Sequence, residues 1–320
     1  MKAVRYHDYG GPEALQIDDV ERPAPGPGEV LVEVAFSSVN PIDWKMASGE
    51  YKMVMPVKRP AIPGYDLSGV IVEVGEGCER LKVGDRVAAH LVEKIGVPGA
   101  THAELTVAPE AQCAVVPEGV DLAEAAALPL AGCTALQALR DDCGMAMSGE
   151  TRRVLIPGAS GGVGHLAVQH AHNAGAHVTA VCSGARAEVV RELGADEVID
   201  YRETSDMLRG EPYDLAVDCA GKAPWSSFKG ALAKGGVLAQ PTPNASWLFA
   251  KIVANTFSSR KIRLTGLKPS RSDLELLLQM MSEGRLRCLI GESFPLEELS
   301  DAWSRNQKGG VLGKISISHK

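Results

Sequence analysis

A run of small residues behind a short apolar segment is the part of this sequence with the clearest chemical meaning. The segment from Arg153 to Pro157 leads through Gly158 into Ala159-Ser-Gly-Gly-Val-Gly164. A strand that turns through small residues into a helix lets the backbone approach a pyrophosphate, toward which the helix start directs free N–H groups and a partial positive charge. The pattern is G-x-G-x-x-G with alanine in the first place. It predicts a dinucleotide site made of Ser160, Gly161, Gly162, Val163 and Gly164.

The end of the next predicted strand distinguishes NAD from NADP. An NAD site usually places an acid there, about 20 residues after the turn, to bind the ribose hydroxyls. The segment from Val178 to Arg186 has no acid; it ends in Ser183 and Arg186, and Tyr201 closes the following strand. A hydroxyl, a guanidinium and a phenol can together hold a 2′-phosphate. We therefore predict NADPH as the cofactor, with a solvated surface arginine as the alternative for Arg186.

Two patterns of secondary structure position these residues. From Met1 to about Pro117, short β-branched runs such as 30–35 and 69–74 are bounded by glycine and proline turns, which is typical of a small β barrel or sandwich. After Leu122, apolar strands alternate with helical segments, which predicts parallel βαβ units in a doubly wound sheet. The tail predicts a helix over 273–284 and a strand over 313–317.

Length and composition agree with a globular protein. The 320 residues predict about two domains, and 45% hydrophobic with 23% charged residues is ordinary for that class. The net charge of −7 argues against a nucleic-acid or anionic-membrane binder. No signal-peptide pattern follows Met1, so we expect a cytoplasmic protein.

Cysteine and histidine offer little for metal chemistry. The seven cysteines contain no Cys-x-x-Cys pair, so free thiols are expected rather than disulfides or a zinc cluster. His165 and His170 follow the glycine turn, where surface or packing roles are expected.

Several further motifs occur in order along the chain, and with them the sequence resembles the medium-chain dehydrogenase/reductase superfamily, within it the zinc-independent quinone oxidoreductase branch. These motifs are Val39-Asn-Pro-Ile-Asp43, Pro63-Gly-Tyr-Asp-Leu-Ser-Gly69, Val83-Gly-Asp-Arg-Val87, Leu128-Pro-Leu-Ala-Gly-Cys-Thr-Ala135, Leu193-Gly-Ala-Asp-Glu-Val-Ile-Asp-Tyr201 and Gly313-Lys-Ile315. The resemblance implies an α/β fold with two domains: a GroES-like, β-rich catalytic domain over 1–122, completed by 268–320, and an inserted Rossmann domain over 123–267 that binds NADPH.

The resemblance also implies that a catalytic metal has been lost. Asn40, Tyr65 and Leu130 occupy the places where zinc alcohol dehydrogenases carry their ligands, with Asp66 next to Tyr65. These side chains cannot replace thiolate and imidazole ligands. We expect no bound metal.

The family pattern assigns four residues to the neighbourhood of the nicotinamide. Tyr51 and Asn40 would be catalytic: Tyr51 donates a hydrogen bond or proton, since a phenol is protonated at neutral pH, or else only shapes the pocket. Asn40 would be an orienting group. Thr134 and, through its backbone alone, Leu312 would contact the cofactor.

The implied activity is a metal-independent, NADPH-dependent reductase that transfers hydride to quinones or α,β-unsaturated carbonyls, whose conjugation spreads the developing charge. An enoyl-thioester or haloacrylate reductase on the same scaffold is one alternative, and a non-catalytic NADPH sensor is another. By analogy with the family we expect a homodimer, with Lys261–Thr265 as the candidate edge strand and no nucleic-acid or membrane partner.

Overall fold

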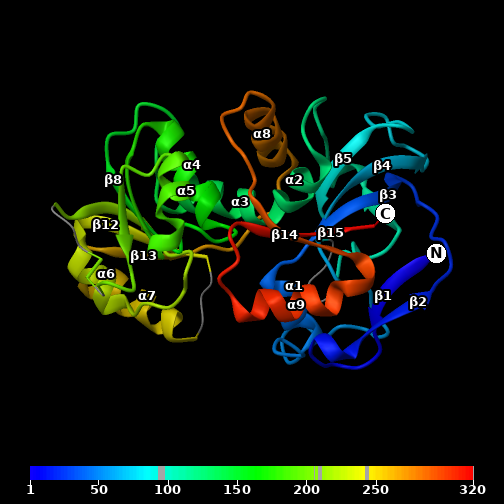
Figure 1. Ribbon diagram of the computed structural model, residues 1–320, viewed down its shortest axis with the longest axis horizontal. Helices are drawn as coiled ribbons and strands as arrows, with labels where there is room; N and C mark the ends of the chain where they lie inside the picture. The colour runs from blue at the N-terminus through cyan, green and yellow to red at the C-terminus, as the bar shows by residue number, and fades with distance from the viewer. Residues whose placement is uncertain (93–97, 205, 208–210, 242–244, 320) are drawn as a thin grey trace. The chain divides into compact units, whose positions relative to one another are not determined.

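The computed structural model describes residues 1–320 except 93–97, 205, 208–210, 242–244 and 320. The chain forms two compact units, which are described separately. Unit 1 consists of Met1–Leu130 together with Pro269–Lys320, and unit 2 consists of Ala131–Lys268. The two ends of the chain therefore build one unit and the middle builds the other (Figure 1).

Unit 1 is built around a mostly antiparallel sheet with the strand order β14-β15-β3-β4-β5-β7, in which β6 also pairs with β3 and β14 runs parallel to β15. A separate antiparallel pair joins β1 to β2. The strands are β1 Lys2–Tyr6, β2 Leu15–Asp19, β3 Glu29–Ser38, β4 Asp66–Val74, β5 Arg86–His90, β6 Leu105–Pro109, β7 Cys113–Val115, β14 Ile290–Pro295 and β15 Lys314–Ser318. The helices are α1 Pro41–Ala47, α2 Leu122–Ala127, α8 Arg271–Ser282 and α9 Leu299–Lys308.

The register of unit 1 brings distant residues together. Alternating apolar residues of β3 and β4, among them Val32, Leu67 and Ile71, are fully buried in one core cluster. Pairing of β4 with β5 sets Asp66 opposite His90, and pairing of β15 with β3 sets Ser316 opposite Ser38. The ends of β3, β4, β5 and β15 thus carry the polar residues discussed below.

Unit 2 is a six-stranded parallel sheet with the order β10-β9-β8-β11-β12-β13, covered by helices on both faces (Figure 1). This confirms the predicted doubly wound α/β arrangement. Its strands are β8 Arg153–Pro157, β9 His177–Cys182, β10 Glu197–Asp200, β11 Tyr213–Val217, β12 Leu232–Gln240 and β13 Lys261–Leu264. Its helices are α4 Gly164–Ala174, α5 Ala187–Glu192, α6 Trp225–Ala231 and α7 Ala245–Phe257, and the boundary between the units falls within α3, Pro129–Gln137.

Several local expectations are confirmed. The predicted helix at 273–284 is α8, two residues earlier, and the predicted strand at 313–317 is β15. His165 and His170 are fully buried in α4, which gives them packing roles. All seven cysteines are free thiols. Across the described ranges, no helix is both long and apolar enough to cross a membrane.

Candidate active site

The glycine turn of unit 2 has the close backbone contacts that a dinucleotide site requires. Gly158 adopts a φ of +76°, and a Cβ added there would lie 2.8 Å from the backbone nitrogen of Ala220. A Cβ at Gly164, the first residue of α4, would lie 2.1 Å from the carbonyl oxygen of Gly158. No side chain caps the start of α4, so its N-terminus is available to a ligand. The sequence pattern put alanine in the first glycine place, but the tight turn is made by Gly158, one residue earlier.

The three residues predicted to read the 2′-phosphate lie at one edge of this sheet. Pairing of β9 with β10 sets Cys182 opposite Asp200, so Ser183 and Tyr201 follow neighbouring strand ends. Ser183 begins the short 3-10 turn that contains Arg186. Tyr201 is 57% exposed. Ser183 and Tyr201 thus follow neighbouring strand ends, and Arg186 lies in the turn after Ser183.

Two charged residues at this edge were not predicted. The guanidinium carbon of Arg202 lies 5.9 Å from the centre of the Tyr201 ring. Asp200 accepts hydrogen bonds from the backbone N–H groups of Gly184 (2.8 Å) and Arg202 (2.9 Å). Its carboxylate therefore fixes the loop backbone. Arg202 adds a second positive charge beside the phenol.

In unit 1 the polar strand ends form a buried cluster around Asp66, which is fully inaccessible to solvent. One oxygen, Oδ1, accepts from His90 Nδ1 at 2.6 Å. The other, Oδ2, accepts from Asn40 Nδ2 at 2.8 Å and from Ser38 Oγ at 3.2 Å. The backbone N–H of Leu130 is 3.2–3.3 Å from both oxygens. The carboxylate is thus surrounded by donors.

A buried cation accompanies this carboxylate. The ammonium of Lys314, at the start of β15, donates to the side-chain oxygen of Asn40 and to the Val39 carbonyl oxygen. Burial alone would raise the pKa of Asp66, but the charge and hydrogen bond of His90, with further contributions from Lys314 and Asn40, hold that pKa below its usual value. Asp66 is therefore ionised in the folded protein.

A second carboxyl group lies at the edge of the cluster. Asp43 accepts from the backbone N–H of Asn40 at 2.7 Å and forms a capping box at the start of α1. Burial raises the pKa of Asp43 well above its usual range, and the backbone bond from Asn40 opposes this. Burial therefore favours its neutral form. Burial also lowers the pKa of Lys314, and the nearby Asp66 carboxylate opposes this.

Comparison with known proteins places this geometry in a family. Residues 26–118 match the model of the alcohol dehydrogenase GroES-like domain, and residues 193–317 match that of the zinc-binding dehydrogenases. A chloroplast envelope quinone oxidoreductase homolog of Arabidopsis thaliana is 39% identical over 99% of this chain and 98% of its own. The chain belongs to the quinone oxidoreductase family of the medium-chain dehydrogenases/reductases. It is an oxidoreductase with the GroES-like and Rossmann-like folds that the sequence predicted.

Other members of the superfamily support this membership. An NADPH-dependent alkenal/one oxidoreductase of Arabidopsis thaliana is 32% identical over 99% of this chain and 79% of its own. The structure of the quinone oxidoreductase from Coxiella burnetii superimposes with a TM-score of 0.89 at 29% identity, over 100% of this chain and 99% of that one. The structure of Escherichia coli quinone oxidoreductase with NADPH has a TM-score of 0.86 over 99% of this chain and 100% of that one, but its 22% identity supports the fold alone.

The zinc implied by the name of one matching model does not fit the residues present. Asn40, Tyr65 and Leu130 stand in the predicted ligand places; the Asn40 amide is bonded on both sides, and Leu130 offers only a backbone N–H. Burial also raises the pKa of the Tyr65 phenol, which disfavours a phenolate ligand. Within the described residues, no group of three or more His, Cys, Asp or Glu side chains could hold a metal ion.

The remaining predicted residues lie in different surroundings. Tyr51 is half-buried and packs against the apolar cluster that contains Met46 and Trp303; for the part of the chain that is described, no hydrogen bond joins its hydroxyl to Asn40. Thr134 is buried on α3, four residues after Leu130. Leu312 precedes β15, and its carbonyl oxygen would be 2.2 Å from a Cβ at Gly291. Of the four residues predicted to lie near the nicotinamide or to contact the cofactor, only Asn40 forms a described hydrogen bond with Asp66.

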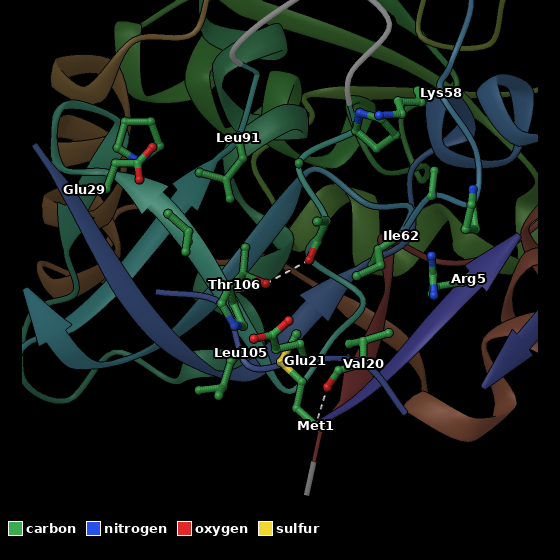
Figure 2. Close-up of a pocket in the computed structure, with 18 residues that line it drawn as sticks. Met1, Arg5, Val20, Glu21, Glu29, Lys58, Ile62, Leu91, Leu105 and Thr106 are labelled. Carbon is green, nitrogen blue, oxygen red and sulfur yellow. Dashed lines mark hydrogen bonds between the residues drawn. The ribbon is translucent and has the colours of Figure 1, made fainter. Parts of the chain in front are cut away.

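A separate hollow of about 620 Å³ in unit 1 involves none of these residues (Figure 2). Its walls include Arg5, Lys58 and Leu105. Hydrogen bonds from Thr106 to the Ala100 carbonyl and from the amino terminus to the Val20 carbonyl lie within it. It contains none of the residues of the Asp66 cluster.

Proposed function

We propose that this protein reduces quinones or α,β-unsaturated carbonyl compounds with NADPH and without a metal. The observation that carries the proposal is the Asp66 cluster, in which protein donors use both carboxylate oxygens and a lysine supplies the neighbouring positive charge. Alcohol oxidation needs a group that stabilises an alkoxide, which a metal ion does in the zinc enzymes. An enone or quinone carries its own electron sink, so positioning and a hydrogen bond suffice.

The residues of unit 2 would hold the cofactor. The backbone from Ser160 to Gly164 would bind the pyrophosphate, and Ser183, Arg186 and Tyr201 would bind the 2′-phosphate, with Arg202 as a further positive charge. NADPH supplies the hydride once it is bound. Thr134 and the backbone of Leu312 remain proposed contacts to the cofactor.

In unit 1, Tyr51 would donate a hydrogen bond to the carbonyl oxygen of the substrate. Asn40 would act differently, because one N–H of its amide donates to Asp66 and its amide oxygen accepts from Lys314. We propose that Asn40 is a positioning residue, which fixes the carboxylate and the ammonium relative to each other.

Assembly and location follow the sequence prediction. We propose a homodimer that pairs through β13, because this strand ends the sheet as described and α7 beside it exposes Phe249 and Phe257. An open strand edge next to apolar side chains is typical of an interface. The cytoplasm remains the proposed location, although several relatives are named as chloroplastic.

NADPH oxidation with a panel of quinones, enones and simple alcohols tests the activity, with and without a chelator. We expect turnover of quinones or enones that the chelator does not change. Tyr51→Phe should lower kcat by about 100-fold if the phenol stabilises the developing oxyanion, and only a few-fold, mainly in KM, if it shapes the pocket. Oxidation of simple alcohols with quinones and enones inert, or about one zinc per chain that activity requires, would refute the proposal.

A further inference from the structure

A histidine–aspartate pair in unit 1 has no role in the reaction described so far. His90 is the last residue of β5, and Asp66, the first residue of β4, lies directly opposite it in the sheet. The two are joined by the 2.6 Å contact between His90 Nδ1 and Asp66 Oδ1. An ionised carboxylate only accepts, so Nδ1 is the protonated nitrogen in this bond.

The carboxylate is held in a fixed orientation. Asn40, Ser38 and the backbone of Leu130 bind Asp66 from other directions. A carboxylate held in this way fixes both the tautomer and the ring orientation of its histidine. The pair therefore has the construction of a buried acid that orients an imidazole.

The second ring nitrogen of His90 faces outward. The side chain of His90 is 10% exposed, whereas that of Asp66 is fully buried. Within the described ranges, His90 Nε2 has no hydrogen-bond partner, and it is not a buried atom. Nε2 is thus the atom that reaches solvent, and it can exchange a proton there.

The other histidines with a described environment are built differently. His102, His170 and His319 are buried, and burial lowers their pKa to about 3, 4 and 4, so they stay neutral. His7 and His177 pair with acids that are partly exposed. Within the described residues, only His90 combines a fully buried carboxylate partner with an outward-facing nitrogen.

We propose that His90 is the proton donor of this reductase and that Asp66 is its positioning residue. The inference rests on the proposed function. The bound cofactor would supply hydride to the β-carbon of an enone, and the electron pair of the C=C bond would move to the carbonyl oxygen. Tyr51 would give that oxygen a hydrogen bond only, and the proton would come from protonated His90 Nε2, which would leave an enol, the oxidised cofactor and neutral His90. Solvent then returns the proton to Nε2, while Asp66 stays ionised.

Among the described residues around His90, the other titratable groups are less suited to this role. The Tyr65 ring centre lies 6.0 Å from the imidazole centre, and burial raises the pKa of its phenol. On β7, burial raises the pKa of Cys113 to about 12. On α2, Glu124 accepts from the backbone of Cys288. Lys314 and Asp43 each form a hydrogen bond with Asn40.

Steady-state kinetics of the intact protein test the proposal. His90→Gln removes the titrating ring, and His7→Gln is the matched control, since His7 Nε2 also lies 2.8 Å from an aspartate, Asp18, but at the surface. We expect His90→Gln to lower kcat by about 100-fold and to abolish the fall of kcat at alkaline pH. His7→Gln should change neither. Imidazole added to His90→Ala should restore at least a tenth of the lost rate.

The outcomes separate this inference from the proposed function. If wild type reduces enones and His90→Gln stays within threefold, or loses activity with an unchanged pH profile and no rescue by imidazole, the role of His90 is refuted and the proposed function stands. If none of the tested quinones or enones is reduced by wild type with NADPH, the proposed function and the role of His90 are both refuted.

A measurement on the wild-type protein covers the case in which the variants do not fold. Nitrogen NMR of the imidazole rings should show His90 with Nδ1 protonated throughout and Nε2 titrating, and Asp66→Asn should change that pattern. A His90 protonated at Nε2 alone, with Nδ1 as acceptor, would contradict the proposed geometry.

Discussion

Alanine substitution at two glycines of the same turn should have different consequences. At Gly164 the new Cβ would lie 2.1 Å from the Gly158 carbonyl oxygen and 2.8 Å from the Ala159 Cα. Both contacts are to backbone, so the start of α4 must move by more than about 1 Å to reach ordinary van der Waals distance. At Gly161 the new Cβ would lie 3.3 Å from the same oxygen, so the backbone would need to move by only a few tenths of an ångström.

The expected magnitudes follow from these contacts. Overpacking costs roughly 1–3 kcal/mol, and the higher helix propensity of alanine returns up to about 1 kcal/mol, so Gly164→Ala should destabilise by about 1–2 kcal/mol. In a unit of this size that corresponds to a Tm lower by roughly 3–8 °C. Gly161→Ala should keep the wild-type stability within about 1 kcal/mol, because neither glycine has a positive φ.

NADPH affinity should fall in both variants, for different reasons. Gly161→Ala places a methyl group where the backbone would approach the pyrophosphate, and Gly164→Ala displaces the helix start that would bind it. Losing one bond to a charged phosphate weakens binding by roughly 10- to 150-fold. Thermal unfolding and a titration of NADPH by calorimetry measure the two quantities. Wild-type NADPH affinity in both variants would show that this turn does not bind the cofactor.

Two further substitutions test the charges of each unit. Arg186→Ala should weaken NADPH by roughly 10- to 150-fold and leave NADH nearly unchanged, with Arg191→Ala as the control; equal losses for both cofactors would show that Arg186 does not read the 2′-phosphate. Lys314→Met should destabilise by roughly 1–3 kcal/mol in chemical denaturation at neutral pH, with the exposed Lys308→Met as the control. It leaves the buried oxygens of Val39 and Asn40 without their donor and removes a positive charge that lowers the pKa of Asp66. Since the pKa of Asp66 is lowered in the folded state, its stabilising contribution is present above the unfolded pKa and is lost as the pH falls. The difference in the free energy of unfolding between wild type and Lys314→Met should therefore become smaller in acid. An equal difference at all pH values would contradict a stabilising interaction between Lys314 and the Asp66 carboxylate.

The fold could be predicted because its signals are local. The turn from Pro157 to Gly164, the apolar strands around it and the alternation after Leu122 each depend on neighbouring residues. The exact bounds of the helices could not be predicted in the same way. The helical segment that begins at Leu122 is interrupted before Pro129, so α2 and α3 are separate helices. A proline cannot donate the helical backbone bond, so it fits the first position of α3.

The site was only partly predictable, because its contacts join residues far apart in the chain. Lys314 and Asn40 are 274 positions apart, and His90 and Asp66 are 24 apart. Asp66 and Lys314 lay in motifs, but their partners depend on strand order and register. His90 had no sequence signal, since a lone histidine at a strand end acquires meaning only when the pairing with β4 is known. Arg202 was hidden for a similar reason, because its stacking on Tyr201 depends on the loop conformation.

Under the proposed function, the charges of the Asp66 cluster would let such a scaffold work without a metal. A buried carboxylate is costly unless a positive charge or several donors accompany it. In a zinc enzyme the ion supplies positive charge, whereas here the Lys314 ammonium and the donors on Asn40, Ser38 and Leu130 do so. The lysine is permanently attached and fully enclosed, so it cannot bind a substrate alkoxide directly. Under the proposal for His90, its outward nitrogen is the atom of this cluster that meets solvent, so proton transfer to a substrate is the chemistry that the cluster would supply.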